Sequence, residues 1–153
     1  MQKLIDLNTR FQAIDPVKAT EAAFGTSKVK ATAKGLNIDQ LEEGKGNQGQ
    51  RLRTDKAVYP NVYAYYTIMI KEMLGDPTDR VTLRDTGKFH QSLQVKPFPG
   101  HAEIIGDTAK PDGDMNENID VSSALGIAPE SEPELIKDVI PEMLRDMRKH
   151  LQI

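Results

Sequence analysis

Apolar residues recur at intervals of three and four along several stretches of the chain, the spacing that places them on one face of a helix. The pattern predicts a helix over residues 2–14 and a second helix that starts at Asp15-Pro16. Aspartate is a good N-cap and proline is tolerated at the first helical position. The second helix is expected to stop at Gly35, a residue that disfavours helix interiors. Two antiparallel helices, an N-terminal helical hairpin over residues 1–35, are the expected result.

A segment with three tyrosines allows two interpretations. Tyr63, Tyr65 and Tyr66 favour a strand, because aromatic residues are enriched in strands. The helical spacing of the apolar residues favours a helix, and Gly75 suits the position just after one. We predict a helix over residues 61–74. Tyrosines on its inward face would pack in the core, and outward ones would suit a protein interface.

Alternation of apolar and polar residues then predicts a β-hairpin. Leu93 and Val95 lie on the first strand, residues 98–100 make the turn, and Ile104 and Ile105 lie on the return strand. On the first strand the period of two separates Leu93 and Val95 from the polar Gln94 and Lys96.

The last helix has the clearest signal. Ser131 and Glu134 form a capping box, and eight apolar residues follow at helical spacing as far as Leu151. Pro141 removes one backbone hydrogen bond and is expected to kink the helix. The elements together predict a single α+β domain over residues 1–153. It has N-terminal helices, a small antiparallel sheet with a central β-hairpin, and a long C-terminal helix packed across the sheet.

Two loop regions interrupt these elements. Three glycines in the sequence GKGNQGQ, residues 44–50, predict a flexible loop. Residues 107–130 form an acidic loop region. Between Asp107 and Asp138 there are nine acidic residues and two lysines. Charge repulsion and low apolar content predict that this region is mobile.

Composition excludes several classes of protein. The chain has no cysteine, which removes disulfide scaffolds, cysteine-zinc sites and thiol nucleophiles. Its apolar runs are too short to span a bilayer, so we expect no membrane partner. The net charge of -3 argues against a sequence-specific nucleic-acid partner. Three histidines leave little material for a metal site, and we expect no cofactor.

Alternating acids after Asp112 are typical of a calcium loop, but the pattern is incomplete. The positions that need glycine and glutamate hold Glu117 and Ser123. A solvated acidic loop is therefore the expected structure. An alternative function is a small metal-dependent hydrolase that uses Asp107, Asp112 and Asp114. Tight stoichiometric binding of Mg²⁺, Mn²⁺ or Ca²⁺ would support that alternative.

Basic residues cluster once, in the glycine-rich loop and just after it, while the acidic region lies elsewhere in the chain. The two could meet between copies, and head-to-tail contacts of this kind build rings. Charge reversal at Arg51 and Arg53 is then expected to weaken assembly. The candidate subunit interface consists of Lys45, Arg51, Arg53, Tyr63, Tyr65, Asp112 and Asp114.

Residues 81–95, VTLRDTGKFHQSLQV, contain Asp-Thr-Gly, then a bulky residue, then a serine. This arrangement resembles the signature of small tailed-phage morphogenesis proteins, the head–tail joining and tail-completion (minor tail) proteins. The resemblance covers roughly residues 36–107. Aspartic proteases share the tripeptide but follow it with serine or threonine, whereas Lys88 follows it here.

The motif residues have a local physical role. Asp85 or Thr86 is expected to cap a short helix, and Gly87 allows a tight entry into it. Phe89 and Leu93 are expected to bury against the hairpin. The motif is therefore assigned to the fold and not to catalysis, and it comprises Asp85, Thr86, Gly87, Phe89 and Ser92.

The resemblance implies a structural virion protein without enzymatic activity. Such a protein would act in head–tail (neck) or tail assembly as part of a ring, after assembly in the host cytoplasm. Its partners would be copies of itself and other neck, tail or portal-proximal proteins. The acidic loop after Gly106 departs from the more typical pattern, so neck and tail positions both stay open. A further alternative is an intracellular adaptor that binds one partner through exposed tyrosines.

Overall fold

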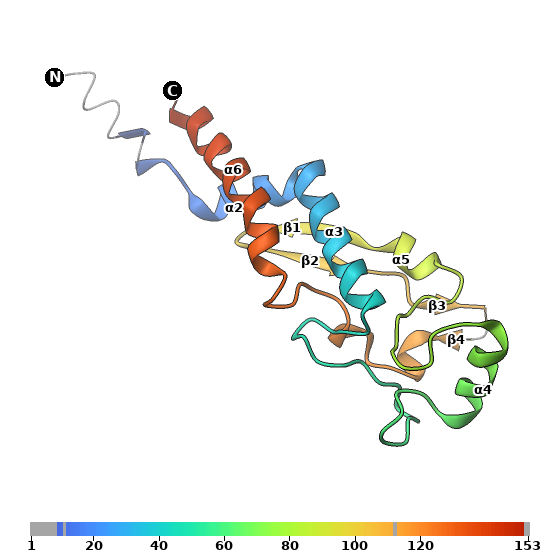
Figure 1. Cartoon of the computed structure of the whole chain (residues 1–153). Helices are drawn as coiled ribbons and strands as arrows, with labels where there is room; N and C mark the ends of the chain where they lie inside the picture. Colours follow the sequence, from blue (N-terminus) through green and yellow to red (C-terminus); the bar gives the residue numbers. More distant parts are fainter. Residues whose placement is uncertain (1–8, 11, 112, 152–153) are drawn as a thin grey trace.

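The structure is a computed structural model that describes residues 9–10, 12–111 and 113–151. It has the predicted α+β fold, with helices around a small antiparallel hairpin and a long C-terminal helix (Figure 1). Its elements are α2 (Pro16–Gly25), α3 (Ser27–Glu42), α4 (Tyr65–Leu74), α5 (Lys88–Ser92), β1 (Gln94–Phe98), β2 (His101–Ile105), β3 (Ala109–Lys110), β4 (Gly113–Asp114), η1 (Met115–Glu117), η2 (Val121–Ser123) and α6 (Glu132–Leu151).

The N-terminal helices differ in their bounds from the prediction. Much of the helix predicted over residues 2–14 lies outside the described residues. The Asp15 side chain caps α2, as expected, by accepting hydrogen bonds from two backbone N–H groups. The chain then leaves the helix at Thr26, whose Oγ1 accepts from Val29 N–H and so starts α3. Gly35 does not stop the helix, because packing of α3 outweighs the low helix propensity of one glycine.

The predicted hairpin forms, with Val95 paired to Ile104 in an antiparallel register. Its first strand starts at Gln94, so Leu93, predicted on the strand, instead ends α5, and Phe98, predicted in the turn, is still paired in β1. Its turn is made by Pro99 and Gly100, and Gly100 has a φ of 80°, in the region that favours glycine. Helices α2 and α3 contact both the hairpin and α6. The C-terminal helix therefore packs on α2 and α3, not across the sheet as predicted.

Two clusters of buried apolar residues hold these elements together. The larger surrounds Leu41 at the end of α3 and includes side chains from the middle of the chain and from the acidic region. The smaller lies between the helices, where Ala23 and Val29 meet Val139 of α6. No helix in the described ranges combines the length and the apolar character that a bilayer crossing requires.

The acidic region is packed against the core, contrary to the predicted mobility. Five of its apolar side chains are buried, and they come from the two 3-10 helices and the turns around them. These residues are Met115, Ile119, Val121, Ala124 and Ala128. The sequence did not reveal these buried residues. They are spaced irregularly among the acidic residues, so they follow neither a helical nor a strand period.

Four amide side chains bind the backbone of residues 122–128, and we call them the amide clamp. Asn37 of α3 donates two hydrogen bonds to backbone carbonyls, of 3.0 and 2.9 Å. Gln40 donates one of 3.0 Å and accepts one of 2.7 Å from a backbone N–H. Asn47 and Gln50, from the glycine-rich loop, donate to three further carbonyls. Buried backbone groups need such partners, and the clamp supplies them.

The glycine-rich loop is held by the same contacts, and this corrects its prediction as flexible. A Cβ atom at Gly46 would lie 2.4 Å from the carbonyl oxygen of Ser123. Glycine at this position therefore allows the two backbones to approach. Gly46 N–H also donates a 2.8 Å hydrogen bond to the carbonyl of Gln50, which closes the loop on itself.

One ion pair between helices predicts a dependence of stability on pH. Asp138 of α6 accepts a 2.6 Å hydrogen bond from Thr32 and lies 2.7 Å from the Lys28 ammonium, both on α3. The hydrogen bonds from Lys28 and Thr32 lower the pKa of Asp138. A carboxyl with a lowered folded pKa stabilises the fold above its unfolded pKa, and this contribution disappears as pH falls through the folded value.

We therefore expect Asp138→Asn to lower the thermal midpoint at pH 7 and to remove part of the wild-type loss of stability below about pH 4. Thermal unfolding of the wild type and the variant at several pH values measures both effects. Equal pH profiles for the two proteins would contradict this assignment.

Candidate functional site

Helix α4 turns its apolar residues to solvent. None of its residues is buried, and six large apolar side chains are between 39% and 85% exposed. We call these six the α4 face, and they are Tyr65, Tyr66, Met69, Ile70, Met73 and Leu74. The prediction of a helix is confirmed, although it starts at Tyr65 and not at residue 61. Among the three tyrosines, two are outward and belong to the class that suits a protein interface.

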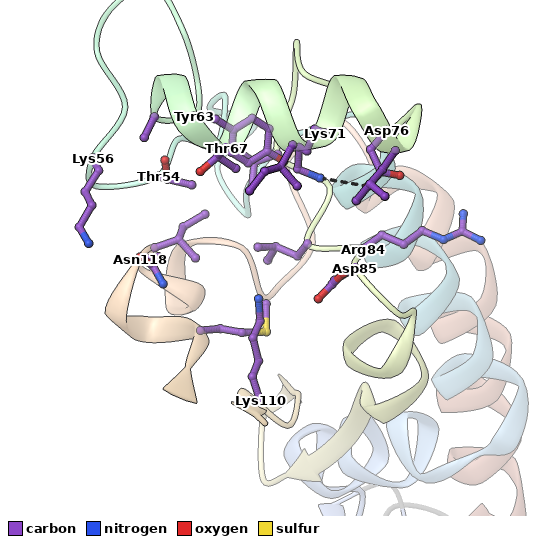
Figure 2. A pocket seen from close by; sticks show the side chains of 17 residues that line it. Thr54, Lys56, Tyr63, Thr67, Lys71, Asp76, Arg84, Asp85, Lys110 and Asn118 are labelled. Atoms are coloured by element: carbon purple, nitrogen blue, oxygen red, sulfur yellow. Dashed lines mark ion pairs between the residues drawn. The ribbon is translucent and has the colours of Figure 1, made fainter. Parts of the chain in front are cut away.

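The residues just before α4 explain its orientation. Val62 and Tyr63 are buried in the larger core cluster, and the Tyr63 hydroxyl donates a 3.1 Å hydrogen bond to the carbonyl of Arg80. These two anchors fill the space beside the core. The inward side of the helix then presents Thr67 and Lys71 (Figure 2). Ile68 packs against the core cluster, and the apolar rows stay exposed, although Ile70 and Leu74 also reach the edge of a neighbouring cavity.

A cavity of about 450 Å³ lies between α4, residues 81–85 and residues 110–119 (Figure 2). Most of its wall is apolar, contributed by side chains of the core cluster and of α4. Its charged groups lie around the cavity in Figure 2, with four cations and two carboxylates. They are Lys56, Lys71, Arg84, Lys110, Asp76 and Asp85.

Two of these cations are already engaged. The Lys71 ammonium lies 3.7 Å from Asp76 and 5.1 Å from the centre of the Tyr63 ring. Arg84 pairs with Glu42 at 3.0 Å. Within the described part of the chain, Lys56 and Lys110 form no ion pair, and neither does Asp85. The cavity is thus a mainly apolar space with two unpaired lysines and one unpaired carboxylate around it.

Two hydroxyl groups of the cavity are held in hydrogen bonds. Burial raises the pKa of Tyr63 to about 12, so its hydroxyl stays protonated and acts as a hydrogen-bond donor. The Thr54 hydroxyl donates to the carbonyl of Val62. The lining contains no histidine that could activate a hydroxyl as a nucleophile. The arrangement is suited to binding an apolar group.

The backbone is strained at the wall of this cavity. Leu83 has a φ of 51°, in the left-handed region that non-glycine residues rarely adopt. Such a conformation costs about 1–3 kcal/mol and persists where the surroundings hold it. The Leu83 side chain packs against the core cluster, which holds the residue in place. Asp85 follows two residues later, so the strained turn places the start of the Asp-Thr-Gly motif beside the cavity.

The motif itself builds the start of α5, but not by the predicted cap. Gly87 is the N-cap residue, with a φ of 78°, and no side chain caps the helix. Because Gly87 occupies that position, Asp85 and Thr86 lie before the cap and are exposed. The prediction that one of them caps α5 is wrong, while the tight entry at Gly87 is as expected.

The rest of the motif joins α5 to the end of the hairpin. Phe89 and Leu93 are buried, and a Cβ atom added at Gly106 would lie 2.7 Å from the Phe89 ring. Ser92 Oγ donates to the carbonyl of Phe89 at 2.7 Å and accepts from Asp107 N–H at 2.8 Å. These residues therefore fix the geometry of the fold.

The basic side of the candidate interface is partly used inside the chain. Lys45 lies 2.8 Å from both Glu43 and Glu130. The predicted attraction between the basic loop and the acidic region is therefore met within one copy at this position. Arg51 is exposed and its guanidinium donates to the carbonyl of Asp79. Arg53 is also exposed and stacks on the ring of Tyr59, 5.5 Å from its centre.

Among the remaining interface candidates, some side chains are used within the chain and others are exposed. Tyr63 is buried and serves the core, which corrects its assignment to an interface, whereas Tyr65 is exposed. Asp114 caps η1 by accepting from Asn116 N–H, and this hydrogen bond lowers the pKa of Asp114. Asp112 lies outside the described residues.

The acids proposed for a metal-dependent hydrolase are not assembled as a site in the described ranges. Asp107 accepts a hydrogen bond from Ala109 N–H, and Asp114 is occupied by Thr108 and Asn116. Over the part of the chain that the structure describes, no group of three or more histidines, aspartates or glutamates is placed to hold a metal ion.

Sequence reasoning missed the outward α4 face and the cavity behind it. Periodicity shows that a helix has an apolar side, but it does not show where that side points. One signal was present in the sequence. Two aromatic residues open the helix, and aromatic residues at the surface are typical of interfaces.

Comparison of the chain with protein-family models, with curated proteins and with solved structures finds no match in any of the three.

Proposed function

We propose that the protein is a structural component of a tailed-phage particle that acts in head–tail or tail assembly as one subunit of a ring. The proposal is carried by the α4 face, whose six large apolar side chains stay exposed, while α4 contributes only the partly buried Ile68 to the core cluster. The resemblance of residues 81–95 to phage joining and completion proteins supplies the class of particle. In this proposal the protein is located in the virion, at the neck or tail.

The α4 face supports an interface because of its size and continuity. Single exposed apolar residues are ordinary, whereas a continuous apolar surface marks a site of interaction. Aromatic residues and methionine, four of the six here, are enriched at such sites. The adjacent cavity adds an apolar recess that a partner side chain could fill.

The proposal assigns the protein a binding role and no catalysis. The cavity lining brings together a protonated tyrosine, a hydrogen-bonded Thr54 hydroxyl, and two lysines and the Asp85 carboxylate that are unpaired within the described residues, and it contains no histidine. This set can hold an apolar group and an anionic neighbour, which is what an assembly contact requires.

We expect the purified full chain to form a closed ring, seen by electron microscopy, with a mass that is a multiple of 17.0 kDa by native mass spectrometry. Met73→Glu should abolish the ring, because this residue is 85% exposed and a buried charge in the contact is unfavourable. The thermal midpoint of the isolated variant should stay close to that of the wild type, as for an ordinary surface substitution. Lys96→Glu, on the exposed side of β1, is the matched control and should still assemble.

Other outcomes would identify the alternatives. If the wild type stays monomeric up to about 1 mM, the ring is contradicted. At that concentration even a contact with a binding free energy of only about 4 kcal/mol would be detected. A monomer that binds Mg²⁺ or Mn²⁺ tightly in calorimetry would favour the hydrolase. A stable dimer that never closes into a ring would favour the adaptor, for which the exposed tyrosines would be the anchors.

A further inference from the structure

We infer that neighbouring copies in the ring meet through two different helices, the α4 face of one copy and a ridge on α6 of the next. The inference rests on the proposed function and names its contact surfaces. The α6 ridge consists of three apolar residues that are 46–48% exposed, Ile136, Ile140 and Leu144. The neighbouring apolar row of α6 packs on α2 and α3, through Leu135, Val139 and Met143. The ridge therefore stays exposed in the folded chain and is accessible to a partner.

The two surfaces have matching spacing. The ridge residues follow one another every four positions, which is a rise of about 6 Å in an α-helix. The α4 face consists of two rows with the same interval, one from Tyr65 to Met73 and one from Tyr66 to Leu74. A single ridge fits the groove between two such rows, and this is the commonest way in which helices pack.

The positions of the two surfaces favour a ring. Figure 1 shows α4 at one end of the molecule, while α6 runs toward the other end beside α2. A contact between two different surfaces is a head-to-tail contact, and such contacts generate closed rings when the rotation closes. If two copies instead paired through their α4 faces, neither would have an α4 face left for a third copy, and assembly through this surface would stop at a dimer.

Charges at the edges also favour this pairing. At 3.6 residues per turn, Glu72 falls beside the α4 face and Arg148 falls beside the ridge. Neither residue has an ion-pair partner in the described ranges. The proposed contact brings opposite charges to its edge, whereas pairing α4 with α4 would bring together two copies of Glu72 and repel.

The apolar area of the α4 face is close to one side of a standard specific contact. Each large aromatic side chain offers roughly 150–250 Å², and the α4 face presents on the order of 700 Å², against about 800 Å² per partner in a standard interface. A second copy is thus able to cover the α4 face with one helix and its surroundings.

Disulfide trapping tests the inference, because the chain has no cysteine of its own. Met69→Cys lies at the centre of the α4 face, and Ile140→Cys lies at the centre of the ridge. When the two single variants are mixed and oxidised, we expect a linked dimer with one copy of each. It should exceed either homodimer by about tenfold or more, the ratio that a preference of 1.4 kcal/mol gives. Lys96→Cys, exposed on β1, is the control and should link to neither.

The double variant, with both cysteines in one chain, should give a ladder of linked oligomers under the same conditions. Linked homodimers of Met69→Cys alone would show α4 against α4 and overturn the inference. If native mass spectrometry shows a ring but the mixed variants do not link, the proposed function stands and these surfaces are wrong. If neither a ring nor a link is found, both proposals fail.

Discussion

Asn37→Asp should destabilise the protein by about 3–5 kcal/mol, the range for an uncompensated buried charge. Asn37 is fully buried, and its side-chain nitrogen donates to the carbonyls of Ala124 and Gly126. A carboxylate has the same shape but cannot donate, so two acceptors would face a negative charge. Because proteins of this size are stable by only about 5–15 kcal/mol, unfolding in urea at pH 7 should shift far toward lower denaturant.

The substitution also has a pH signature. Burial beside carbonyl oxygens raises the pKa of the introduced carboxyl. A group with a raised folded pKa favours the folded state below its unfolded pKa, and that advantage is lost as pH rises through the folded value. The deficit relative to wild type should therefore be smallest near pH 4, close to the ordinary aspartate pKa, and should grow as pH rises toward about 7.5. Asn37→Ala, which adds no charge, is the control, and its deficit should not depend on pH.

Phe89→Ala should remove about 3–5 kcal/mol from the free energy of unfolding, as expected for a buried aromatic residue. The Phe89 ring lies in the larger core cluster and against Gly106 at the end of the hairpin. Truncation would leave a cavity between α5 and the hairpin. Chemical denaturation measures the loss, and near-ultraviolet spectra would report loosened packing.

Asp85→Ala is the matched comparison within the same motif. Asp85 is exposed and does not cap α5, so its stability change should stay within about 0.5 kcal/mol. A large loss in Asp85→Ala would mean that the aspartate supports the fold through a contact of its own. Similar losses in both variants would contradict the division of the motif into a buried and an exposed half.

Local signals in the sequence predicted the elements whose geometry depends on nearby residues. The Asp15 cap, the hairpin with its turn at Pro99 and Gly100, and the Gly75 position after α4 each follow from neighbours along the chain. The break at Thr26 was also local, since a threonine after Gly25 can cap a new helix, but the continuous apolar spacing concealed it.

Features that depend on distant residues were not predicted. The outward side of α4 depends on Val62 and Tyr63 occupying the core first, and helical periodicity contains no such information. The order of the acidic region depends on amides from α3 and the glycine-rich loop. Asparagine and glutamine in those segments look like ordinary polar residues until the fold places Asn37 and Gln40 in the interior.

The amide clamp has a consequence for the order of folding. Its hydrogen bonds join residues that are between 73 and 89 positions apart in the chain. Bringing together residues so far apart costs chain entropy before any contact has formed. These contacts therefore form slowly compared with the helices and the hairpin. Met115 and Ile119 lie in the segment that leads to the clamped backbone, and they line the cavity beneath α4. We therefore expect this side of the cavity to form late in folding. A newly made chain would thus complete its local structure first and enclose the cavity beneath α4 only at the end.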